Sequence, residues 1–136
     1  MKRSMFVLAL MLSSTAFAND VYDCTVSPQS FTDFGSAFTV SLGSHTIRIS
    51  GFDGKSTDVK KISGEIDRNY HPRPQNRGSL RYKTVVSGGS FGSGCGEADV
   101  YLNPTMASGR NGRLTIAYDC DSDGSGPLFE VFDCRR

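Results

Sequence analysis

A short acidic segment near the carboxyl end carries the most specific chemical pattern in this sequence. The segment DCDSDG, followed by Glu130, places carboxylates at Asp119, Asp121, Asp123 and Glu130 with the spacing D-x-D-x-D-G-x5-E. At this spacing, oxygen ligands at alternate positions can surround one calcium ion, and the glycine permits the tight turn. The flanking residues alternate like strands, so an acidic β-hairpin loop is the other interpretation. Calcium is the only cofactor that the sequence suggests.

A basic loop, DRNYHPRPQNRG at residues 67–78, holds a second group of side chains that could bind a ligand. Guanidinium groups bind carboxylates, phosphates and acidic glycans through paired hydrogen bonds, and arginine with tyrosine is typical of protein contact surfaces. The competing interpretation is a solvated loop that only maintains solubility. The open glycine-rich segment at residues 87–96 could extend the same contact surface. The candidate binding residues are Arg68, Tyr70, His71, Arg73 and Arg77.

The sequence offers few groups for enzyme catalysis. The pattern G-x-S-x-G occurs once, at residues 88–92, but there it belongs to a glycine-rich segment that we predict to be a loop and not the strand-to-helix turn of serine hydrolases. The carboxylate pairs Glu97 with Asp99 and Asp119 with Asp121 could carry out acid–base chemistry, but acidic pairs are common on the solvated face of a strand. We therefore predict a non-catalytic binding protein that acts through its loops or its barrel mouth. A calcium-dependent hydrolase that uses the acidic hairpin is an alternative.

Residues 1–18, MKRSMFVLALMLSSTAFA, have the pattern of a secretory signal peptide. Lys2 and Arg3 form the charged start, residues 5–12 form the apolar core, and residues 16–18 form a small-x-small cleavage site before Asn19. The apolar stretch is too short to span a bilayer. We therefore expect a periplasmic or secreted protein that does not span the membrane.

The remaining residues, 19–136, are about the length of one domain. The chain has 15 basic and 14 acidic residues, and loss of Lys2 and Arg3 with the signal peptide leaves 13 basic ones. A nearly neutral exported domain is a poor match for the phosphate backbone, so we expect no nucleic-acid partner. A small ligand or a protein is the expected partner.

Period-two alternation of apolar residues recurs along the chain and predicts an all-β domain of about eight short strands. We expect an antiparallel meander, closed into a small barrel or folded as a two-sheet sandwich. Gly64 interrupts the fourth strand, residues 57–66, and indicates a bulge or a close backbone approach. The apolar positions are Tyr22, Cys24 and Val26; Phe38, Val40 and Leu42; Ile47 and Ile49; Ile62 and Ile66; Leu80, Tyr82 and Val86; Ala98, Val100 and Leu102; Leu114, Ile116 and Tyr118; and residues 127–134.

The four cysteines predict two disulfides, because an even number in an exported chain is typical of structural bridges. No Cys-x-x-Cys motif or suitably spaced histidine indicates zinc. If Asn103 faces Arg113 in the hairpin of strands six and seven, paired positions sum to about 216. This register places Cys120 opposite residue 96 and within reach of Cys95. We therefore predict a Cys95–Cys120 disulfide.

The same arrangement predicts the second bridge. Cys120 lies beside the turn between strands seven and eight, whereas Cys134 lies at the far end of that hairpin, about six residues away at roughly 3.4 Å each. A disulfide requires Cα atoms within about 7 Å, so these two cysteines cannot bond. Cys24 is left to pair with Cys134, which joins the first strand to the last as closure of an even-stranded meander requires.

The segment Val21-Tyr22-Asp23-Cys24 resembles the Tyr-x-Cys opening of small periplasmic lysozyme inhibitors of β-barrel form. The likeness covers three residues, and it transfers no site residue to this chain. It implies a third class of function, a proteinaceous inhibitor of an envelope enzyme such as a lysozyme. Such an inhibitor would act through protruding loops, whereas a small-ligand carrier would need an apolar pocket.

Overall fold

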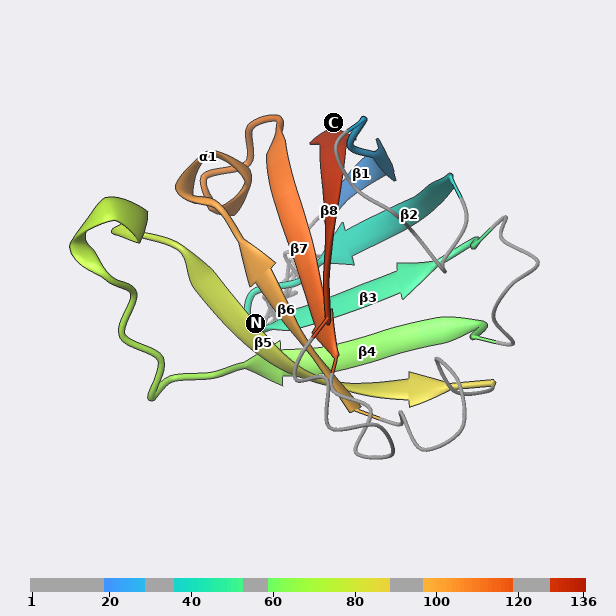
Figure 1. Ribbon diagram of the computed structural model, residues 1–136, viewed down its shortest axis with the longest axis horizontal. Coiled ribbons are helices and arrows are strands. Elements are labelled where there is room, and N and C mark those ends of the chain that lie inside the picture. The colour runs from blue at the N-terminus through green and yellow to red at the C-terminus, as the bar shows by residue number, and fades with distance from the viewer. Residues whose placement is uncertain (1–18, 29–35, 53–58, 89–96, 119–127) are drawn as a thin grey trace, which may run out of the picture.

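The computed structural model describes residues 19–28, 36–52, 59–88, 97–118 and 128–136, which form a closed antiparallel barrel (Figure 1). Its strands are β1 (Asp20–Val26), β2 (Ala37–Leu42), β3 (Thr46–Ser50), β4 (Lys61–Ile66), β5 (Leu80–Ser87), β6 (Glu97–Leu102), β7 (Gly112–Tyr118) and β8 (Leu128–Arg135). Two short helices, η1 (Pro74–Asn76) and α1 (Pro104–Ala107), lie between strands. Within the described ranges, no helix is long and apolar enough to cross a membrane.

The predicted meander closes into a barrel, so the alternative two-sheet sandwich is wrong. Each strand pairs with the next one in the chain, and a ladder between β1 and β8 completes the ring. This ladder runs from Asp23 opposite Arg135 to Val26 opposite Phe132. Closure gives backbone partners to two strands that would otherwise expose unpaired edges.

The strand predicted at residues 57–66 is shorter in the structure. β4 begins at Lys61, because its partner β3 is only five residues long and the ladder ends where Ser50 faces Lys61. Residues 53–58 lie outside the described residues. The hairpin register of β6 and β7 is as predicted, since Leu102 faces Leu114. Beyond that pair, the amide nitrogen of Asn103 donates to the carbonyl oxygen of Arg113 at 3.2 Å.

Side chains fill the interior of the barrel. An eight-stranded barrel is just wide enough for inward-facing residues to occupy its centre. The alternating apolar positions of the sequence supply these residues, and most of them are completely buried. In the described part of the chain, packed side chains thus take the space that a ligand chamber would need. The largest fully buried side chains are Tyr22, Phe132, Ile47, Ile49, Ile62, Leu102, Met106, Leu114, Ile116, Val40 and Val100.

The predicted disulfide between Cys24 and Cys134 is confirmed. The two residues face each other in the closing ladder, with their Cα atoms 4.0 Å apart, and both side chains are buried. The bridge therefore links neighbouring strands that are 110 residues apart in sequence. Cys95 and Cys120 lie outside the described residues, so the Cys95–Cys120 disulfide stays a prediction.

A single helical turn, α1, covers one end of the barrel where the sequence indicated only a connection. The Asn103 side chain accepts a hydrogen bond from the amide nitrogen of Met106 at 2.9 Å, which caps the turn, and Pro104 occupies the favoured first position. Met106 is fully buried, and its carbonyl oxygen accepts a hydrogen bond from the Tyr22 hydroxyl at 3.3 Å. The turn thus closes this end with an apolar side chain.

We expect the free energy of unfolding to fall as the pH rises above about 10. Burial raises the pKa of both Tyr22 and Tyr82 above the ordinary value of 10.0. The unfolded chain therefore loses these tyrosine protons first, so the stabilisation present below pH 10 disappears as the pH rises through the folded pKa. Urea unfolding measured between about pH 8 and about pH 11 would show the decline. Tyr82→Phe should make the free energy of unfolding fall less steeply with pH. An equally steep fall in this variant would contradict the assignment of the decline to Tyr82.

Candidate functional site

The connection between β4 and β5, residues 67–79, is the main candidate contact surface. It begins with a turn in which the Asp67 side chain accepts a hydrogen bond from the amide nitrogen of Asn69 at 3.0 Å. The amide nitrogen of Tyr70 donates to the carbonyl oxygen of Asp67 at 3.2 Å, and η1 follows after Arg73. In Figure 1 this segment, coloured lime green, stands away from the barrel wall. We call it the β4–β5 loop.

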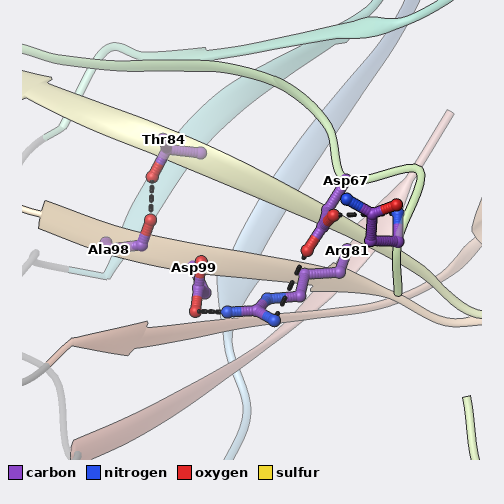
Figure 2. Close-up of polar contacts among 6 residues, drawn as sticks. Asp67, Arg81, Thr84, Ala98 and Asp99 are labelled. Carbon is purple, nitrogen blue, oxygen red and sulfur yellow. Dashed lines mark hydrogen bonds and ion pairs between the residues drawn. The ribbon is translucent and has the colours of Figure 1, made fainter. Parts of the chain in front are cut away.

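A guanidinium on the barrel wall holds the first residue of this loop. Arg81 of β5 forms ion pairs with Asp67 at 3.5 Å and with Asp99 of β6, to which it also donates a hydrogen bond (Figure 2). The Asp67 side chain is 8% exposed and the Arg81 side chain 29% exposed, so water screens these contacts only in part. The hydrogen bond to Asp99 raises the pKa of Arg81, which keeps the guanidinium charged.

Aromatic packing holds a second point of the loop. The Tyr70 ring meets the ring of Tyr101 on β6 edge to face, with centroids 5.7 Å apart. The Arg81 guanidinium lies 5.8 Å from the centre of the same Tyr101 ring. Burial raises the pKa of Tyr101, so this hydroxyl stays neutral over the physiological range. Asp67 and Tyr70 are therefore both fixed to the same part of the wall, which limits the movement of the residues between them.

The structure places the five predicted binding residues in this one loop, but in different environments. Tyr70 is half-buried against the wall, as described above. The other four side chains, those of Arg68, His71, Arg73 and Arg77, are exposed. None of the three arginines forms an ion pair with another described residue. Their role in binding stays a prediction, and the structure shows that these guanidinium groups are accessible.

The contacts at the base of the loop could not be predicted from the sequence. In the ladder of β5 and β6, Arg81 faces Tyr101, and Lys83 faces Asp99. The outward position of Arg81 was visible in the alternation, but its partners depend on this register. The register could not be read from the sequence because the long glycine-rich segment between the strands has no single residue that marks the centre of a turn. Asp99, a candidate for acid–base chemistry, instead pairs with Arg81.

Of the four predicted calcium ligands, only Glu130 lies within the described residues. Asp119, Asp121 and Asp123 lie outside the described residues. Glu130 lies on β8 with its side chain turned into the barrel, where it is 5% exposed and accepts a hydrogen bond from the Tyr118 hydroxyl at 2.8 Å. The calcium hypothesis therefore stays a prediction.

The barrel mouth, the other predicted contact surface, holds a small hollow beside α1. Its volume is about 240 Å³, which is below the roughly 300–1,000 Å³ of typical small-molecule sites. Buried Met106 and Tyr82 lie at its floor, and the turn after β2 forms part of its rim. The mouth is thus a weaker candidate than the loop.

Known proteins provide no template for this site. No protein-family model, curated protein or solved structure matches the chain. The function must therefore be inferred from the fixed base of the β4–β5 loop and from its exposed arginines.

Proposed function

We propose that this protein is a non-catalytic binding protein whose contact surface is the β4–β5 loop and whose partner is another protein. The observation that carries the proposal is the combination of a fixed loop base with exposed guanidinium groups. The loop base is tied to the wall through Asp67 and Tyr70. Arg68, Arg73 and Arg77 remain exposed and form no ion pair with a described residue.

A loop held in place before binding loses less conformational freedom when its partner arrives. Ordering one side chain at an interface costs about 0.5–1.5 kcal/mol, and a flexible backbone adds to that cost. The contacts of Arg81 and Tyr101 already order part of the loop in the folded protein, so less conformational entropy is lost on binding. Arginine and tyrosine are also among the residues most often found to dominate binding energy at protein interfaces.

The filled barrel supports a protein partner over a small apolar ligand carried inside. The apolar side chains of the described strands pack against each other in the core. A partner that presents carboxylates is the best match for the loop, because guanidinium groups pair with carboxylates through two parallel hydrogen bonds. The predicted signal peptide supports binding to the partner in the periplasm or outside the cell.

Inhibition of an envelope enzyme such as a lysozyme is the second candidate function, favoured by the way the loop projects from the barrel. Enzymes that hydrolyse glycosidic bonds use two carboxyl groups about 5–9 Å apart in an open cleft. A narrow projecting loop that carries Arg73 next to a proline could enter such a cleft and pair with those carboxylates. The opening segment of the mature chain, which resembles the Tyr-x-Cys start of barrel-shaped lysozyme inhibitors, supports this candidate.

The test compares the mature protein with a variant that has Arg68, Arg73 and Arg77 all changed to alanine. Both are used as baits in an envelope extract, and recovered partners are then measured individually by surface plasmon resonance and, for lysozymes, by inhibition of cell-wall lysis. We expect the triple variant to bind at least about a hundredfold more weakly, since several arginines at one interface each contribute to binding. Binding by the unchanged protein should also weaken as salt is added.

The matched control removes the same number of positive charges elsewhere on the barrel. Lys61, Arg113 and Arg135 are exposed on other strands, and their replacement by alanine changes the net charge by the same amount. Full binding by this control together with loss in the loop variant would support the proposal. Equal recovery of partners by the wild-type and loop-variant baits would exclude the β4–β5 loop as the contact surface.

A further inference from the structure

A groove on the outer wall of the barrel, away from the exposed arginines of the β4–β5 loop, has the size and lining of a small-molecule site. Its volume is about 390 Å³, within the roughly 300–1,000 Å³ of known ligand sites. It runs over β2, β3 and β4 and reaches Val85 on β5. Gly43 and Gly64 both line it. We call it the Arg48 groove.

One row of paired residues defines the chemistry of this groove. In the ladders, Ser41 faces Arg48, Arg48 faces Ser63, and Ser63 faces Val85, so their outward side chains lie side by side across the wall. Arg48 is exposed and forms no ion pair with another described residue. A guanidinium between two serine hydroxyls can bind a carboxylate through two parallel hydrogen bonds while the hydroxyls donate or accept further ones.

The neighbouring row of paired residues narrows the chemical class of ligand that the groove could bind. Thr46 faces Glu65 there, and both residues line the groove. The Glu65 carboxylate can accept hydrogen bonds from ligand hydroxyls, and it would repel a doubly charged phosphate more strongly than a singly charged carboxylate. Val85, a residue that is 65% exposed, offers an apolar surface at the edge for the C–H face of a sugar ring. The groove thus combines one cation, several hydroxyl partners and one apolar wall.

We propose that the Arg48 groove binds an acidic monosaccharide, a sugar ring that carries one carboxylate beside free hydroxyl groups. Arg48 holds the carboxylate, Ser41 and Ser63 flank it, and Glu65 accepts hydrogen bonds from the ring hydroxyls. This site is separate from the proposed protein contact through the β4–β5 loop. Asn19, the predicted first residue of the mature protein, also lines the groove, so the protein tested should begin at Asn19 without an added tag.

The test titrates the isotope-labelled mature protein with D-glucuronate and follows backbone amide resonances. We expect saturable shifts at residues of β2, β3 and β4, and D-glucose, which lacks the carboxylate, should bind about tenfold more weakly or worse. Arg48→Gln should raise the Kd for D-glucuronate by about tenfold or more, and Arg48→Lys by less. Arg113→Gln removes an exposed arginine from another part of the wall and should leave the Kd unchanged. The triple alanine variant of the β4–β5 loop should also bind D-glucuronate normally.

Three results would overturn the proposal. The first is the absence of saturable shifts with D-glucuronate, and the second is an equal Kd for wild type and Arg48→Gln. The third is that inorganic phosphate shifts the same resonances at the same concentration, which would show a general anion site. Because Arg48 and Ser41 lie on the outside of the wall, Arg48→Gln and a second variant, Ser41→Ala, should both keep the amide spectrum of the folded barrel.

Discussion

Replacement of both Cys24 and Cys134 by alanine is expected to lower the free energy of unfolding by about 3–5 kcal/mol. The bridge closes a loop of 110 residues, nearly the whole predicted mature chain. In the chain-entropy model, a link across so long a loop restricts the unfolded chain by about 4.8 kcal/mol. The sulfur atoms are also buried, so their loss leaves a small void where β1 meets β8.

Urea unfolding followed by circular dichroism is the appropriate measurement, because the chain has no tryptophan. The slope of the unfolding free energy against urea should increase, since an unlinked chain exposes more surface when it unfolds. Wild-type protein in which the Cys24–Cys134 disulfide and the predicted Cys95–Cys120 disulfide have been reduced should be no more stable than the double variant. Coincident urea midpoints for wild type and variant would show that the barrel closes equally well without the bridge.

The second large effect is expected from Gly64→Ala, which should destabilise the barrel by about 3 kcal/mol. A β-carbon at Gly64 would lie 2.2 Å from the carbonyl oxygen of Lys83 and 2.6 Å from Cγ2 of Thr84. The carbonyl belongs to the paired strand β5, so β4 and β5 would have to separate. Replacing glycine by alanine also restricts the unfolded chain, which stabilises by only about 0.4–1 kcal/mol. The steric cost therefore outweighs the entropic gain.

A second substitution separates the two sources of this clash. Thr84→Ser removes the methyl group and keeps the hydroxyl that donates to the carbonyl oxygen of Ala98. Added to Gly64→Ala, it should recover only part of the lost stability, because the Lys83 carbonyl remains in place. Lys61→Ala on the same strand is exposed and should change stability by no more than about 0.5 kcal/mol. Thermal melts that do not distinguish Gly64→Ala from Lys61→Ala would contradict the close approach.

Both proposed sites are built from outward-facing parts of the barrel. The loop base depends on side chains of β5 and β6, and the Arg48 groove depends on adjacent outward residues of four strands. Neither site needs a chamber inside the barrel. An eight-stranded barrel with a filled core therefore leaves its outer wall and its loops as the available surfaces for recognition.

The sequence alone was sufficient for the local pattern and for one long-range contact. Alternation of apolar residues identified the strands because side chains in a strand point alternately to opposite faces. The Cys24–Cys134 pair followed from strand lengths and hairpin order, since cysteines at opposite ends of a hairpin cannot bond. Gly64 was correctly identified as a point of close approach, because a glycine inside a strand is otherwise unfavourable.

Tertiary structure alone decided the partners of Arg81 and the composition of the Arg48 groove. Each depends on which residues face each other on neighbouring strands, and a shift of one residue in register would turn every side chain to the other face. Arg81 meets Asp99 across 18 residues of sequence, and the intervening glycine-rich segment gives no signal for that spacing. Met106 was likewise hidden, because it enters the core from a helical turn instead of from an alternating strand.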